Sequence, residues 1–134
     1  MIGSAWLHDF SRPRLWLGVW LFGWLLCVVL SLSSPIQIGS GLDNSDKLGH
    51  FLAYAALSGW SVLIFPRRQA RWTAAASLIL LGVAMELAQH QFTVDRVMDP
   101  RDALANTLGV VAAQCLAWTP ARSWLQRLDA RLFG

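Results

Sequence analysis

Polar side chains recur at helical spacing in three segments of this 134-residue chain that are otherwise apolar. In the first segment, Lys47, His50 and Tyr54 are followed by Ser58 and Ser61, at steps of three and four residues. These steps place all five side chains on one face of a helix. Ionisable and hydroxyl groups gathered in this way can bind a polar ligand or transfer protons.

The second and third segments repeat the pattern. Glu86, Gln89 and His90 share a helix face near the end of one segment, and Asp102 and Asn106 are four residues apart at the start of the next. At a rise of 1.5 Å per residue, His50, Asn106 and Glu86 each lie about 5 to 7 Å inside one end of their helices. The sequence therefore predicts that three helices contribute to a single polar layer.

The residue types in this layer allow several kinds of chemistry. Glu86 and His50 could act as acid and base on a substrate, and together with His90 they form a mixed nitrogen and oxygen donor set of the kind that binds metal ions. Our prediction is nevertheless that the protein holds no metal ion and no cofactor. Lys47 and Arg96 at the mouth suit a phosphate or a carboxylate, because a guanidinium group offers two parallel N–H donors.

Each of these residues also has a purely structural interpretation. Glu86 could simply pair with Arg96 or with Lys47, and Asp102 could be the N-cap of its helix. The histidine and tyrosine of the first segment could hydrogen-bond across helices. A small residue such as Gly109 is typical of close helix packing in membranes.

The composition indicates the class of protein in which these polar residues occur. Apolar and aromatic residues make up 55% of the chain, and charged residues only 14%, against about 25% in soluble domains. This balance argues against both a soluble globular domain and a disordered chain. Charge-poor intervals predict helices at about 15–33, 48–65, 72–91 and 103–119, each near the roughly 20 residues that a membrane span needs. We therefore predict a single all-α domain over residues 1–134, a polytopic four-transmembrane-helix bundle.

The basic residues predict the orientation of this bundle. Eight of them lie in the N-terminal segment, the second connection and the C-terminal tail: Arg12, Arg14, Arg67, Arg68, Arg71, Arg122, Arg127 and Arg131. Because basic residues favour cytoplasmic loops, both termini are expected on the cytoplasmic side of the membrane. The net charge of +3 is thus a topology signal, and no nucleic-acid partner is predicted.

Two further features bear on the ends of the chain. The residues after Pro120 place Trp124 and Leu128 on one side of a helix and Arg127 on the other, which predicts a short amphipathic tail along the inner membrane surface. The apolar run at 15–32 could alternatively be the core of a secretory signal.

The ordered set of polar residues resembles the VanZ-like family of small bacterial membrane proteins. The likeness spans residues 46–109, about half of the chain, and ends on Gly109; the matching polar residues are Asp46, Lys47, His50, Tyr54, Glu86, Gln89, Arg96, Asp102 and Asn106. The name-giving member is associated with resistance to the glycopeptide teicoplanin, and the biochemical activity of the family is not established. The resemblance implies a cell-envelope context and marks these nine residues as the candidate site.

The leading hypothesis is a membrane protein with an outward-facing polar pocket that binds a lipid-linked or peptidoglycan-related ligand and has membrane lipids as its other partners. A membrane-embedded hydrolase or transferase that uses Glu86 and His50 as acid and base is one alternative. A scaffold whose polar layer only holds the helices together is another. Neither the reaction nor the oligomeric state follows from the sequence.

Overall fold

A computed structural model describes residues 6–33, 45–92, 94 and 98–134. These residues form the helices α1 (Pro13–Leu32), α2 (Ser45–Ile64), α3 (Arg68–Phe92), α4 (Pro100–Gln114) and α5 (Trp124–Phe133), with two short 3₁₀ helices, η1 (Cys115–Trp118) and η2 (Pro120–Ser123), between α4 and α5. The described part contains no strand. The all-α prediction is confirmed.

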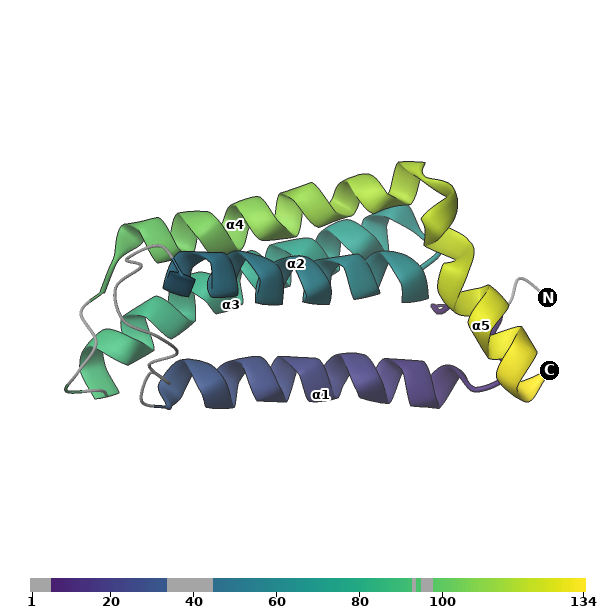
Figure 1. The fold of residues 1–134 in the computed structure, drawn as a ribbon, viewed down its shortest axis with the longest axis horizontal. Helices are drawn as coiled ribbons and strands as arrows, with labels where there is room; N and C mark the ends of the chain where they lie inside the picture. Colours follow the sequence, from purple (N-terminus) through teal and green to yellow (C-terminus); the bar gives the residue numbers. More distant parts are fainter. Residues whose placement is uncertain (1–5, 34–44, 93, 95–97) are drawn as a thin grey trace.

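The four long helices run back and forth along the longest axis of the molecule (Figure 1). The start of α1 and helix α5 lie at one end. The end of α1, the start of α2, the end of α3 and the start of α4 lie at the other end. The helix starts and ends that carry the candidate site are therefore gathered at the end farthest from α5.

Glycine residues allow close contact among α2, α3 and α4. A Cβ atom at Gly109 on α4 would lie 2.3 Å from the backbone oxygen of Phe51 on α2, which is far closer than two such atoms can approach. At Gly82 on α3, an added Cβ would meet Asn106 of α4 at 3.1 Å and Tyr54 of α2 at 3.4 Å. Both glycines thus mark helix packing, as expected for Gly109, and they bring the polar faces of three helices together.

Two helices, α1 and α3, are long and apolar enough to cross a membrane by length and composition. The prediction of four spans is supported only to this extent. The fourth helix has 15 residues and ends at Gln114 instead of near residue 119, and polar residues along α2 lower its hydropathy. Large apolar side chains nevertheless remain exposed on all four helices, with Phe22 on α1 62% exposed and Leu80 on α3 70% exposed.

The predicted amphipathic tail is present as α5, and its packing adds a feature that the sequence did not indicate. Leu125 is fully buried against the bundle, whereas Trp124 is half exposed. Asp129, on the same helix, is also buried and accepts hydrogen bonds from the backbone N–H groups of Ser11 and Arg12 and from Nε1 of Trp16. The last helix is therefore fastened to the segment that leads into α1.

Candidate functional site

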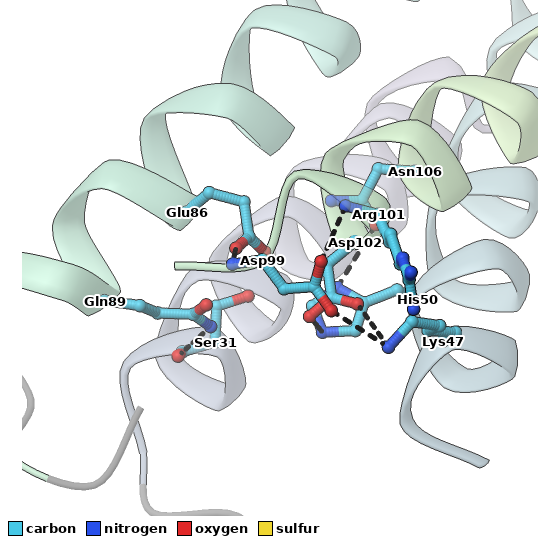
Figure 2. A network of polar contacts seen from close by, with 9 residues as sticks. All are labelled: Ser31, Lys47, His50, Glu86, Gln89, Asp99, Arg101, Asp102 and Asn106. Atoms are coloured by element: carbon cyan, nitrogen blue, oxygen red, sulfur yellow. Dashed lines mark hydrogen bonds and ion pairs between the residues drawn. The ribbon is translucent and has the colours of Figure 1, made fainter. Parts of the chain in front are cut away.

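Polar side chains from three helices meet at the end of the bundle opposite α5. Figure 2 shows that α2 contributes Lys47 and His50, that α3 contributes Glu86, and that Asp102 and Asn106 project from α4. The prediction of convergence is confirmed for these five residues. We call this group, together with Asp99, the polar cluster.

Lys47 forms ion pairs with two carboxylates at the open edge of the polar cluster. Its Nζ atom lies 3.1 Å from Oδ2 of Asp99 and 3.5 Å from Oδ1 of Asp102. Asp99 is also the N-cap of α4, where its Oδ1 accepts from the backbone N–H of Arg101 at 2.9 Å. That hydrogen bond, followed by the contact with Lys47, lowers the pKa of Asp99 below its ordinary value. The charge of Lys47 is thus already balanced within the cluster.

The alternative that Asp102 is the N-cap is wrong, because Asp99 occupies that position and Pro100 begins the helix. Asp102 lies in the first turn, where it faces α2 and is 8% exposed. A carboxylate at this position is favoured by the partial positive charge of the helix N-terminus. Asp102 is therefore free to interact with groups on α2 and α3.

His50 connects α2 to α4 through both of its ring nitrogens. Its Nδ1 atom lies 3.2 Å from Oδ1 of Asn106, and its Nε2 atom lies 4.0 Å from Oδ2 of Asp102. An amide oxygen can only accept a hydrogen bond, so His50 donates through Nδ1 in this arrangement. The close contact at Gly109, one turn beyond Asn106, holds the two helices at this spacing.

Glu86 is a buried carboxylate with few hydrogen-bond partners among the described residues. It is 2% exposed, and its Oε2 atom accepts from the backbone N–H of Asp99 at a long 3.4 Å. Its Oε1 atom has no hydrogen-bond partner among the described residues. The partner expected from the sequence, Arg96, lies outside those residues. The other expected partner, Lys47, contacts Asp99 and Asp102 instead.

Three further residues of the predicted site lie outside the polar cluster or outside its described contacts. Gln89 on α3 donates from Nε2 to the backbone oxygen of Ser31 on α1 at 2.6 Å, as Figure 2 shows. Tyr54 is 1% exposed and lies in an apolar cluster with Leu57 and Leu78. Asp46 belongs to the first turn of α2, and its side chain lies outside the described part of the structure.

The cluster offers a metal-binding donor set, but one that differs from the sequence hypothesis. His50, Glu86 and Asp102 each present one ligand atom, and these atoms all lie within 4.8 Å of one another. His90, the third member of the expected set, is exposed on α3 and does not belong to this group. Asp102 replaces it because α4 packs against α2 at the level of His50.

Sequence reasoning missed Asp99 and its role. The dipeptide Asp99-Pro100 carries a usable signal, since an aspartate N-cap followed by proline is a frequent helix start.

The sequence predicts a polar pocket at this place, whereas in the structure Glu86, Asp102 and Asn106 are buried in the bundle. The cluster is a packed group whose open edge is formed by Lys47 and Asp99, with side chains 29% and 36% exposed. A cavity of about 470 Å³ lies at the opposite end, where its lining includes Phe65 and Arg67.

Comparisons with protein-family models, with curated proteins and with solved structures find no match to this chain. The functional argument is therefore built on the geometry of the polar cluster.

Proposed function

We propose that this protein is a multi-pass protein of the bacterial inner membrane whose polar cluster binds the polar part of a lipid-linked or peptidoglycan-related ligand at the outer membrane face. The observation that carries the proposal is the buried, incompletely satisfied Glu86. An ionisable side chain held inside an apolar helical bundle is costly and marks a functional site by default.

Exposed apolar surface supports the membrane setting of the proposal. Leucine side chains more than half exposed occur on every long helix: Leu25 on α1, Leu52 on α2, Leu80 on α3 and Leu108 on α4. Apolar surface of this extent is unfavourable in water and marks a membrane or protein contact. Four spans with cytoplasmic termini would place the polar cluster at the outer face.

The chemistry of the cluster favours a particular kind of headgroup. Its described carboxylates, Asp99, Asp102 and Glu86, outnumber its one described ammonium group, that of Lys47. A ligand with hydroxyl, amide or amino donors suits this balance better than a bare phosphate does. The sugar and peptide parts of a cell-wall precursor supply such donors, in agreement with the VanZ-like resemblance and its link to glycopeptide resistance.

The acid and base alternative has one observation in its favour. Ligand atoms of His50 and Glu86 lie within 4.8 Å of each other, a separation that a substrate hydroxyl or a water molecule could bridge. A hydrolase or transferase would therefore use the same cluster, and product formation would separate it from simple binding.

The proposal is tested by binding of the polyprenyl-linked disaccharide pentapeptide to the full chain in lipid nanodiscs, followed by native mass spectrometry. We expect Glu86→Gln and Asn106→Ala to weaken binding at least tenfold, because both remove groups of the cluster. The matched control is His90→Ala, which changes an exposed residue on the same helix as Glu86. Equal binding by all four proteins would leave the scaffold interpretation standing.

Orientation is tested separately by cysteine labelling in whole cells. Cys27 and Cys115 are first replaced by serine, because Cys115 is exposed. Single cysteines are then introduced at Ser40 and Gln69. We expect an impermeant maleimide to label position 40 from outside and not position 69; the reverse pattern would contradict the proposed orientation.

Teicoplanin susceptibility of bacteria that express the wild-type or the Glu86→Gln chain tests the link to resistance. We expect only the wild-type chain to reduce susceptibility.

A further inference from the structure

The polar cluster holds three metal-ligating side chains from three different helices. His50 lies on α2, Glu86 on α3 and Asp102 on α4, and their ligand atoms all lie within 4.8 Å of one another. We propose that these three residues bind one divalent transition-metal cation. This inference concerns the cation alone and does not depend on the lipid-linked ligand proposed above.

Charge balance is the first argument. Lys47 pairs with Asp99 and Asp102, which leaves the described cluster with a surplus of negative charge, and Arg101, the other nearby described cation, is exposed. Oε1 of Glu86 is buried and has no hydrogen-bond partner among the described residues. A buried carboxylate is normally paired or coordinated to a metal. A cation between Glu86 and Asp102 would supply the missing charge.

The orientation of His50 is the second argument. Metal-binding histidines usually donate a hydrogen bond from the ring nitrogen that does not touch the metal, and this bond fixes the tautomer and the ring plane. Here Nδ1 faces Oδ1 of Asn106 at 3.2 Å, while Nε2 points to Oδ2 of Asp102 at 4.0 Å. The lone pair of Nε2 is therefore directed toward the same space as a carboxylate oxygen.

The three ligand atoms lie near enough for side-chain rotation to bring them onto one ion. In a tetrahedral site with zinc bonds of about 2.0 to 2.2 Å, two ligand atoms are about 3.3 to 3.6 Å apart. The three atoms lie within 4.8 Å of one another, so shifts of about 1 Å in their side chains would complete the site. Nitrogen and carboxylate oxygen donors suit zinc and manganese. Three protein ligands leave at least one position for a water molecule, which is typical of catalytic rather than structural zinc sites.

The experiment uses the full-length, tag-free chain in detergent, treated with chelator and then titrated with Zn²⁺ by calorimetry. We expect one ion per chain. Glu86→Gln and His50→Ala should each weaken binding at least tenfold, since even residues that only support a ligand alter affinity by about 10- to 100-fold. The control His90→Ala should bind like the wild type. An equal loss in His90→Ala, or wild-type affinity no higher than that of Glu86→Gln, would overturn the proposal.

X-ray absorption of the Zn²⁺-loaded protein provides a second measurement that does not depend on the variants. We expect oxygen ligands and one imidazole. Sulfur ligation would assign the ion to Cys27 or Cys115 and contradict the inference. Precursor binding measured with and without chelator distinguishes the two proposals. Zinc binding without precursor binding would support the cation site and exclude the proposed ligand. Precursor binding without zinc binding would support the ligand and exclude the cation site.

Discussion

Two buried carboxylates at opposite ends of the bundle differ in how fully they are satisfied. Asp129 on α5 is 2% exposed and accepts from two backbone N–H groups and from the indole of Trp16, the last at 2.7 Å. Glu86 on α3 is equally buried, yet among the described residues it accepts only one long hydrogen bond, from Asp99. The same burial thus accompanies nearly complete pairing at one end and an open oxygen at the other.

This difference separates a structural carboxylate from a binding group. Hydrogen bonds to a charged acceptor stabilise the folded chain, whereas a buried acceptor without partners costs free energy until something binds it. Asp129 needs nothing beyond the chain, because the backbone before α1 and the indole of Trp16 within α1 supply its donors. In both of our proposals, Glu86 gains its remaining contacts from a ligand or an ion.

The largest expected effect is on thermal stability, when Asp129 and its hydrogen bonds are removed. Asp129→Ala leaves three donors without their acceptor, and we expect the melting temperature in detergent to fall by on the order of 10 °C. Asp9→Ala, which changes an exposed aspartate in the neighbouring segment, should leave the melting temperature unchanged. Similar values for the two variants would mean that Asp129 does not fasten α5.

The second largest effect is expected from the close contact of α2 with α4 at Gly109, which positions the polar cluster. Gly109→Ala forces a methyl group toward the backbone of Phe51, and overpacking of this kind costs about 1 to 3 kcal/mol. We also expect weaker ligand binding, since separation of α2 from α4 moves His50 away from Asn106. Gly18→Ala, where nothing lies within 4 Å of the added atom, is the matched control and should be neutral or slightly stabilising.

A third test concerns Oε1 of Glu86, the buried oxygen without a hydrogen-bond partner among the described residues. In chelator-treated protein, Glu86→Gln removes an underpaired buried charge, so we expect the melting temperature to stay unchanged or to rise by a few degrees. Zn²⁺ at 100 times its dissociation constant should then stabilise the wild type by about 2.7 kcal/mol and Glu86→Gln by much less. Destabilisation of the chelated variant would place Glu86 with Asp129 among the structural carboxylates.

The smallest effect is a dependence on pH. Burial alone raises the pKa of Asp129, but the hydrogen bonds from Trp16, Ser11 and Arg12 outweigh it and lower the pKa below the ordinary 3.8. A lowered pKa in the folded chain contributes stability above the unfolded value, and this contribution is lost as the pH falls through the folded value. The stability difference between wild type and Asp129→Asn should therefore shrink between about pH 5 and about pH 3. A constant difference over this range would contradict the assigned pairing.

The sequence was most informative where a single helix carries its own periodicity. Steps of three and four residues were enough to predict the polar face of α2, and similar depth along three helices was enough to predict that His50, Glu86 and Asn106 come together. These predictions depend only on helix geometry and on up-and-down topology, and both are present in the structure.

Contacts set by tertiary packing were not accessible in the same way. Gln89 was assigned to the site by its helix face, but the position of α1 brings Ser31 within 2.6 Å of it. The spacing of four residues from Glu86 makes His90 a candidate metal ligand, whereas the close α2–α4 contact brings Asp102 to Glu86 and His50 instead. The fastening by Asp129 joins segments whose proximity has no local signal in the chain.

That fastening also sets an order of events during synthesis. Asp129 binds the backbone of Ser11, a residue made 118 positions earlier. At elongation rates of about 5 to 20 residues per second, the segment before α1 waits several seconds or longer without its acceptor. The hydrogen bonds to Asp129 therefore cannot form until the ribosome has made residue 129, whereas the same segment can contact α2 earlier, through the backbone hydrogen bond from His8 to Ile64.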